Sequence, residues 1–140
     1  MQKKQIPQNE KQRLVKRIAS RIKKRENIIF AYIFGSFVRD DKFSDIDIGI
    51  FCRETENIDF LSFEFKLEEE INSIIKFPVD VRIINHAPLS FVFNVIKEGM
   101  LIKDEDPNER ADFEGMIFKK YADFAIYRKQ YLKEVLNAPV

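Results

Sequence analysis

Apolar residues recur along this chain with two spacings, one typical of helices and the other of strands. In the first segment, Leu14, Ile18 and Ile22 follow one another at intervals of four, which places them on one face of a helix. Polar and charged residues fill most of the positions between them, so we expect the opposite face to meet solvent. The helical spacing predicts helices over residues 9–25, 58–75, 88–99 and 107–136.

Residue types mark the ends of two of these helices. Pro88 suits the first turn of a helix, where its missing N–H is not needed, and Gly99 marks the end of the same segment. Asp106 can accept a hydrogen bond from the first turn of the last helix, which Pro107 begins. We expect this last helix to be an appendage or a partner-binding surface.

Runs rich in β-branched and aromatic residues predict the strands. The first, IIFAYIF, ends at Gly35, and polar turn residues lie between it and the second, DIDIGIF, so we expect the two to pair. The predicted strands cover residues 28–34, 45–51, 79–84 and 100–102. This mixture predicts an α+β fold in which helices pack on a small mixed sheet. We expect one domain over residues 1–140, with its core in about 10–103 and a C-terminal helix in about 107–136.

Composition narrows the partners of the protein. Lys plus Arg number 24 and Asp plus Glu 23, so a net charge of +1 gives no general attraction to nucleic acid or membranes. The first 25 residues are rich in Lys and Arg; we interpret them as a solvated helix face, with a nucleic-acid surface as the alternative. The single cysteine, Cys52, cannot form an internal disulfide, and there is no long apolar run. We therefore expect a cytoplasmic protein.

Two acidic residues interrupt the second strand. Side chains alternate along a strand, so Asp45 and Asp47 lie on one face, with Cα atoms about 6.5 to 7 Å apart. Two carboxylates that converge to ~4 Å repel by about 4 kcal/mol at an effective dielectric constant of 20. A divalent cation is the simplest compensation, and hard oxygen ligands suit Mg²⁺ or Mn²⁺. The alternative is an edge strand with a wet face, where alternating acids oppose aggregation.

The residues after the first strand suit an anion. Glycine at position 35 lets a phosphate approach the backbone, and the hydroxyl of Ser36 can donate to a phosphate oxygen. If the next segment is helical, its first N–H groups add to the same site. Arg39 is three residues further and can reach the same phosphates. The alternatives are an ordinary turn at Gly35-Ser36 and a surface charge at Arg39.

A third acid, Asp80, lies in the otherwise apolar strand PVDVRII. Val79 and Val81 are expected to face the core, which leaves Asp80 and Arg82 on the opposite face. Carboxylates from two strands can hold two metal ions and leave one oxygen to accept a proton. The alternative is a salt bridge between Asp80 and a nearby Arg or Lys.

These residues together carry a family resemblance. A strand, Gly35-Ser36, a short loop, Asp45-Ile-Asp47, a helix and Asp80 in a later strand resemble the DNA polymerase β-type nucleotidyltransferases over residues 10–103. The small size is similar to the minimal nucleotidyltransferase (MNT) branch, many of whose members are antitoxins paired with a HEPN-domain RNase toxin. The stretch YADFAIYRKQYL resembles the C-terminal helix of that branch.

The resemblance implies a role for each residue. Gly35, Ser36 and Arg39 would bind the nucleotide, and Asp45 and Asp47 would bind Mg²⁺. Asp80 would bind a second metal ion and activate the acceptor hydroxyl. The implied reaction is transfer of AMP from ATP to a tyrosine of the HEPN toxin.

The sequence departs from the family pattern in one loop. Eight residues separate Ser36 from Asp45, and Arg39 is followed by Asp40 where the family often has glycine. A shorter loop narrows access for the nucleotide. Three alternatives therefore remain: an antitoxin that neutralises its toxin by binding alone, a transferase for a small molecule, and a transferase for RNA. The basic first helix motivates the RNA acceptor, although nucleic acid is not the expected partner. A homo-oligomer is the alternative assembly.

Overall fold

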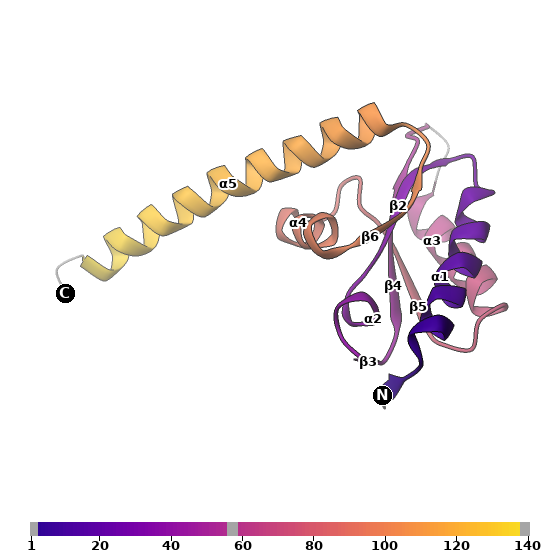
Figure 1. The fold of residues 1–140 in the computed structure, drawn as a ribbon. Coiled ribbons are helices and arrows are strands. Elements are labelled where there is room, and N and C mark those ends of the chain that lie inside the picture. The colour runs from indigo at the N-terminus through magenta and orange to yellow at the C-terminus, as the bar shows by residue number, and fades with distance from the viewer. Residues whose placement is uncertain (1–2, 56–58, 138–140) are drawn as a thin grey trace.

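The computed structural model describes residues 3–55 and 59–137 and is built around one mixed four-stranded sheet (Figure 1). The order of the strands is β5-β4-β2-β6; β4 and β5 are parallel, and β2 pairs antiparallel with both of its neighbours. The strands are β2 (Ile28–Phe34), β4 (Ile46–Cys52), β5 (Val79–Ile83) and β6 (Met100–Asp104). The pairing of the first two predicted strands and the α+β class are thus confirmed.

Helices cover both faces of the sheet (Figure 1). On one face, α1 (Gln8–Lys23) and α3 (Phe60–Asn72) bury their apolar stripes against the isoleucines of β4. On the other face lie α4 (Leu89–Glu98) and the first turns of α5 (Pro107–Asn137). The second core is rich in aromatic residues; the rings of Phe30, Phe51 and Phe113 pack together with centroids 4.5 to 5.8 Å apart.

Three short elements, which the sequence analysis did not predict as such, fix the loop between β2 and β4. Helix α2 spans Ser36–Arg39, and strand β3 (Lys42–Phe43) pairs antiparallel with β1 (Lys4–Gln5). The fully buried Phe43 packs edge-on against Phe37 of α2, with ring centroids 4.8 Å apart. The loop that carries the Gly-Ser motif is therefore anchored to the core.

The observed boundaries shift the predicted elements by a few residues. Helix α3 starts at Phe60 because the side chain of Asp59 accepts a hydrogen bond from the Ser62 N–H at 3.3 Å, and it ends before residue 75. Residue 58, where we expected the helix to begin, lies outside the described residues. Strand β4 starts at Ile46, so Asp45 comes directly before it rather than within it. Strand β6 extends two residues beyond the predicted 100–102.

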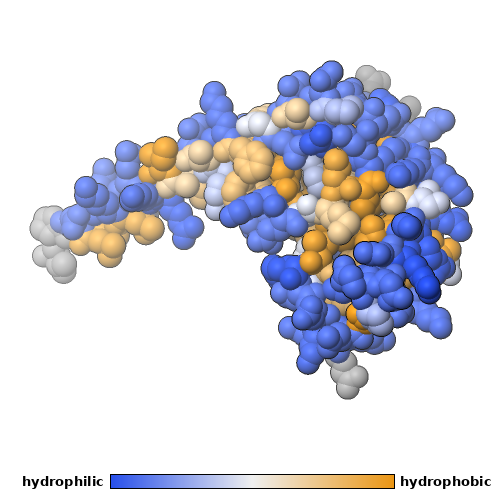
Figure 2. Space-filling view, viewed as in Figure 1, coloured by the Kyte–Doolittle hydropathy of each residue, from blue (hydrophilic) through white to orange (hydrophobic). Residues whose placement is uncertain are grey.

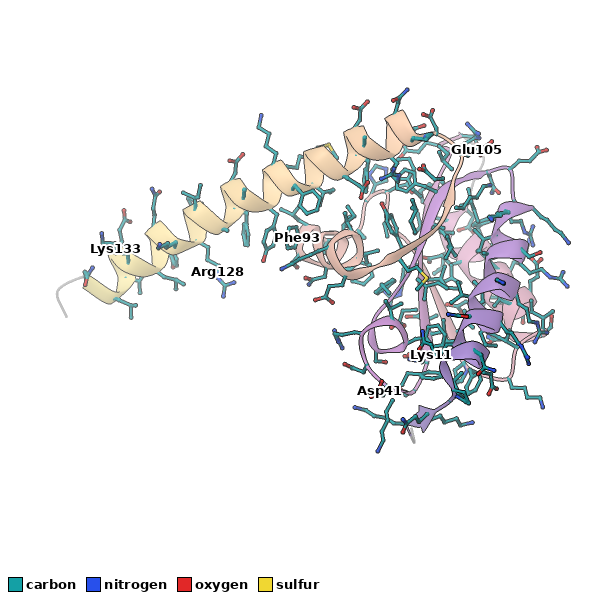
Figure 3. The ribbon with its side chains drawn as sticks, in the orientation of Figure 1. Lys11, Asp41, Phe93, Glu105, Arg128 and Lys133 are labelled. Carbon is teal, nitrogen blue, oxygen red and sulfur yellow. The ribbon has the colours of Figure 1, made fainter. Side chains whose placement is uncertain are left out.

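Helix α5 begins as predicted and then leaves the body of the protein (Figure 1). Asp106 accepts the N–H of Glu109 at 3.1 Å, and Phe113 and Ile117 are buried against the sheet. The ring of Phe93 in α4 stacks on Tyr121, with centroids 3.8 Å apart (Figure 3). Residues 122–137 are all exposed. Within the described residues, no helix combines the length and the apolar character that a membrane span requires.

Candidate active site

Two of the predicted acids face each other across neighbouring strands. Asp47 of β4 and Asp80 of β5 are partners in the parallel register, and Asp45 lies two residues before Asp47. Ile46 and Ile48 are buried on the opposite face of β4, so the predicted alternation of acidic and apolar residues is present. Three carboxylates from one end of two adjacent strands therefore belong to one region of the surface.

Asp47 is the electrostatic centre of this region. Burial, followed by the negative charges of Asp45 and Asp80, raises the pKa of Asp47 from its ordinary 3.8 to about 6. The positive charge of Arg82 acts in the opposite direction and does not cancel the shift. The fold therefore holds a carboxylate where its ionised form is disfavoured, and a cation bound beside it would relieve that cost.

Gly35 lies against Asp47, and its backbone conformation is one that glycine adopts readily. Its φ is +83°, and a Cβ added to it would collide with Oδ2 of Asp47. The sequence indicated a glycine that lets a phosphate approach; the structure adds that this glycine makes room for the carboxylate. Helix α2 starts at the next residue, Ser36, and the carbonyl of Gly35 accepts the N–H groups of Val38 and Arg39 at 3.1 Å. The segment after Gly35-Ser36 is therefore helical, which is the condition given above for additional N–H groups at an anion site.

Lys11 of α1 holds this turn in place. Its Nζ donates hydrogen bonds to the carbonyl oxygens of Phe37 and Asp40, both at 2.8 Å, and lies 5.1 Å from the centre of the Phe37 ring (Figure 3). These contacts place a positive charge at the C-terminal end of α2, where the helix dipole favours it. The sequence analysis placed Lys11 in a solvated basic face, and neither spacing nor residue type marks its distant partners.

Arg39 forms ion pairs with acidic residues other than Asp45, Asp47 and Asp80. Its side chain is exposed and pairs with Glu98 of α4 at 3.4 Å and with Asp40 at 3.5 Å. Exposed ion pairs of this kind contribute little, typically about 0–1 kcal/mol, so they exchange readily for a bound phosphate. The phosphate contact of Arg39 is not tested by these ion pairs and stays a prediction.

A row of polar side chains on α3 occupies the free edge of β5, next to Asp80. Glu68 accepts the N–H of Val81 at 2.8 Å, and Glu64 accepts the N–H of Ile83 at 2.7 Å. Asn72, one helical turn beyond Glu68, accepts the N–H of Val79 at 3.1 Å. The sequence analysis did not identify these residues; their spacing of four along α3 is the signal that could have found them.

Asp80 has two polar neighbours of its own. Nε of Arg82 lies 3.6 Å from its carboxylate, which is the salt bridge given above as the alternative interpretation of Asp80. Its other neighbour is Glu68. Burial and a hydrogen bond between the two carboxyl groups raise the pKa of Glu68, while the Val81 N–H opposes the shift. Asp80 thus lies between the cation of Arg82 and the carboxyl group of Glu68, whose pKa is raised.

The donor set fits a hard divalent cation. Carboxylate oxygens are the ligands that Mg²⁺ and Mn²⁺ prefer, and Mg²⁺ keeps several waters and substrate phosphate oxygens beside one or two carboxylates. Within residues 3–55 and 59–137, no three Asp, Glu, His or Cys side chains are gathered closely enough to form a complete cation site by themselves. Asp45, Asp47 and Asp80 therefore do not make a complete cation site by themselves, and their role as metal ligands stays a prediction.

A family model described as "Polymerase beta, Nucleotidyltransferase" matches residues 16–108, which include all three acids and the Gly35-Ser36 turn. The match covers well over half of the chain. The chain belongs to this nucleotidyltransferase family. A comparison with curated protein sequences finds no match.

Solved structures share the fold of this nucleotidyltransferase. One is the tri-AMPylated Shewanella oneidensis HEPN toxin in complex with an MNT antitoxin, with a TM-score of 0.69 and 19% identity over 90% of this chain and 98% of that one. Another is the toxin–antitoxin MntA–HepT, with a TM-score of 0.68 and 18% identity over 89% and 98% of the two chains. A third is a toxin–antitoxin with AMP-PNP, with a TM-score of 0.70 and 18% identity over 87% and 98%. At these identities, the comparisons establish the fold.

The histidine and the cysteine of this nucleotidyltransferase have other surroundings. His86 is exposed and pairs with Glu54 at 2.5 Å. Cys52 is buried, and burial raises the pKa of its thiol to about 12, so it is not a nucleophile at neutral pH. The amide of Asn85 fixes the backbone of Cys52 through two hydrogen bonds of 2.9 and 2.8 Å. The cluster of Asp45, Asp47 and Asp80 is therefore the candidate site for group transfer.

Proposed function

We propose that this protein is a Mg²⁺-dependent nucleotidyltransferase that acts as an antitoxin by transferring AMP from ATP to a tyrosine of a HEPN-domain RNase toxin. The register of Asp47 against Asp80, with Asp45 beside Asp47, is the observation that carries this proposal. A stable sheet gains nothing from such a cluster, because burial and then the negative charges of Asp45 and Asp80 raise the pKa of Asp47. Functional sites are where perturbed carboxylates of this kind concentrate.

Each residue has a role in this reaction. Gly35 and Ser36 bind the triphosphate, and Arg39 joins them after leaving Glu98. Asp45 and Asp47 would hold one Mg²⁺ ion, and Asp80 would contribute to a second; Mn²⁺ is the alternative. When bound, the ions neutralise phosphate charge and make the acceptor hydroxyl easier to deprotonate. The main contributions of the protein are thus positioning and electrostatic stabilisation.

The chemical step balances with these groups. Asp80 accepts the proton of the acceptor hydroxyl, whose oxygen attacks the α-phosphorus of ATP. The new bond joins that oxygen to phosphorus, and the bond between the α-phosphorus and the bridging oxygen breaks. Pyrophosphate leaves with the electron pair of that bond. The product is an AMP ester of the acceptor.

Helix α5 supplies a surface for the toxin. Its exposed second half carries an apolar face flanked by cations, and Figure 2 shows apolar residues along this arm. Five basic and two acidic residues in 119–137 favour an acidic partner. Aromatic residues and arginine, which interfaces favour, are both present. The exposed large apolar residues beyond Tyr121 are Phe124, Ile126, Tyr127, Tyr131, Leu132, Val135 and Leu136.

Binding without transfer is the second candidate function. The size of this exposed face favours it, since an interface on α5 needs no contribution from the acids. The two functions differ in their requirements: masking survives the loss of Asp47, whereas AMP transfer does not. An RNA acceptor receives less support, because several cations of the N-terminal region are engaged within the protein. Lys11 holds α2, Arg17 donates to the carbonyl of Ile74, and Arg25 pairs with Glu70.

The test is to co-express the protein with a HEPN-domain RNase toxin and measure the intact mass of the toxin. We expect a mass increase by whole AMP units, and tandem mass spectrometry should place them on tyrosine. Asp47→Asn is expected to abolish the increase while the two proteins still co-purify. Unmodified partner in the wild-type complex would leave masking as the function.

A further inference from the structure

A groove of about 570 Å³ runs along the free edge of β5, between α3 and the start of α4. Figure 1 shows these two helices on opposite sides of the sheet, so the edge strand forms the floor between them. The residues that define its character are Leu61, Phe65, Asp80, Arg82, Pro88 and Phe91. Of the residues assigned to the nucleotide and metal site, Asp80 is the one that lines this groove.

The groove is continuous with the acidic cluster. Asp80 lines the groove and is also the register partner of Asp47. On the α4 side, the ring of Phe91 packs edge-on against Phe34, with centroids 5.6 Å apart, and Phe34 is the partner of Asp47 in β2. A ligand in the groove therefore places its end at Asp80, within reach of a nucleotide held by Asp45 and Asp47.

Apart from Arg82, the exposed side chains that line the groove are apolar. Leu61 is 76% exposed and Phe65 is 60% exposed, although both lie on a helix whose opposite face is buried in the core. Large exposed apolar side chains gathered along a groove mark a binding surface. Pro88 and Phe91 give the facing wall the same character. The groove therefore suits an aromatic or aliphatic group.

The charged groups of the groove argue against other classes of acceptor. Glu64 and Glu68 direct carboxylate oxygens to the N–H groups of Ile83 and Val81, so they are not a free row of anions for a polycationic small molecule. Arg82 is the basic residue of the lining, which is too little positive charge to follow a nucleic-acid backbone. The same hydrogen bonds occupy outward N–H groups of β5, so an acceptor is recognised through its side chains rather than as an added strand.

We propose that this groove is the acceptor subsite and that it binds a polypeptide segment bearing tyrosine, with the aromatic ring between Phe65 and Phe91 and the hydroxyl at Asp80. This inference rests on the proposed function, since it assigns the acceptor of the same transfer. The phenolic oxygen forms the bond to the α-phosphorus, its proton passes to Asp80, and pyrophosphate leaves. Phe65 and Leu61 are specificity-determining residues that take no part in the bond changes.

The experiment is an NMR titration of the full-length labelled protein, with and without AMP-PNP and Mg²⁺. The probes are N-acetyltyrosinamide, N-acetylserinamide, tobramycin and a short oligouridylate. We expect the tyrosine amide to shift the resonances of Phe65, Arg82 and Phe91 in a saturable manner. Phe65→Ser should weaken its binding by about tenfold, equivalent to roughly 1.4 kcal/mol. Lys66→Ser, an exposed neighbour on the same helix, should leave binding unchanged.

The outcomes separate this inference from the proposed function. Absence of tyrosine-dependent shifts in the groove, equal shifts with serine amide, tobramycin or oligouridylate, or an equal affinity in Phe65→Ser would each overturn the acceptor assignment. The proposed function fails by a different result, namely the absence of Mg²⁺-dependent AMP-PNP shifts around Gly35 and Asp47. In a transfer assay with the protein partner, Phe65→Ser should reduce modification while nucleotide binding is retained.

Discussion

Asp47 of β4 and Asp80 of β5 occupy the same level of two parallel strands, so neighbouring backbones hold their carboxylates on one side of the sheet. Parallel register is set by the backbone ladder and by the isoleucines and valines buried on the other face. A shift of either strand by one residue would turn its acid into the core. The packing of the apolar face therefore specifies the position of the acids.

The charge on Asp47 should destabilise the metal-free protein. Its pKa is about 6 in the folded state against an ordinary 3.8, so between these values the folded state binds more protons than the unfolded state. Stability should therefore fall as pH rises from about 4 to 6.5 and level off above that. The loss is about 1–2 kcal/mol after allowance for solvent screening of a partly exposed group.

Urea denaturation at several pH values, in buffer containing EDTA, measures this effect. Asp47→Asn should be more stable than the wild type at pH 7.5 and nearly equal to it at pH 4. A wild-type protein that gains stability over this pH range relative to the variant would show that Asp47 is not the strained carboxylate.

Gly35→Ala should disrupt the site from within. The new Cβ meets Oδ2 of Asp47, and alanine is strained at a φ of +83°. We expect a loss of about 1–3 kcal/mol in the free energy of unfolding, together with loss of nucleotide binding. Gly115→Ala is the matched control, because a Cβ there meets nothing within 4 Å. That change lies inside α5 and should stabilise the protein by up to about 1 kcal/mol; equal effects at the two glycines would contradict the account.

Lys11→Met should loosen α2 without touching the acids. It removes two hydrogen bonds of 2.8 Å to the carbonyls of Phe37 and Asp40. We expect weaker ATP binding and a stability loss of about 1–3 kcal/mol, as for hydrogen bonds made by a charged group. Lys23→Met removes the same charge from an exposed position of α1 and serves as the control. Identical ATP affinities of the two variants, measured by calorimetry, would refute the anchoring role of Lys11.

The exposed face of α5 should be required for the partner and dispensable for the nucleotide. Phe124→Ser combined with Tyr131→Ser is expected to abolish co-purification with the HEPN-domain protein, because both side chains are about half exposed and belong to the apolar face. The thermal midpoint and ATP affinity should stay unchanged. Lys133→Ser is the control on the same helix. Intact complex formation by the double variant would place the interface elsewhere.

Much of this architecture was predictable from local patterns. The period of four in α1 and the alternation in β4 identified the elements, because burial of one face imposes those spacings on the sequence. The acids stood out for the same reason, since Asp47 and Asp80 interrupt otherwise apolar strands. Asp45 was placed within the strand, whereas the structure puts it just before Ile46. Its position two residues from Asp47 was correct, but pairing with neighbouring strands decides where the ladder begins.

Contacts between distant segments were not predictable. Lys11 and Asp40 are 29 residues apart, and nothing local distinguishes Lys11 from the other lysines of α1. Strands β1 and β3 have two residues each, which is too short for an alternation to be visible. Glu64 and Glu68 were not identified from the sequence, because their acceptor role depends on the edge of β5 lying beside α3. Tertiary arrangement, rather than residue type, gives these side chains their partners.

The central claim is that Asp45, Asp47 and Asp80 form a metal-dependent nucleotide site. Isothermal titration calorimetry of ATP into the wild type, with Mg²⁺ and with EDTA, tests it most directly, and Asp47→Asn is the matched variant. We predict binding that requires Mg²⁺ and disappears in the variant. Binding of equal strength without Mg²⁺ or in Asp47→Asn, or no binding of ATP at all, would contradict the claim.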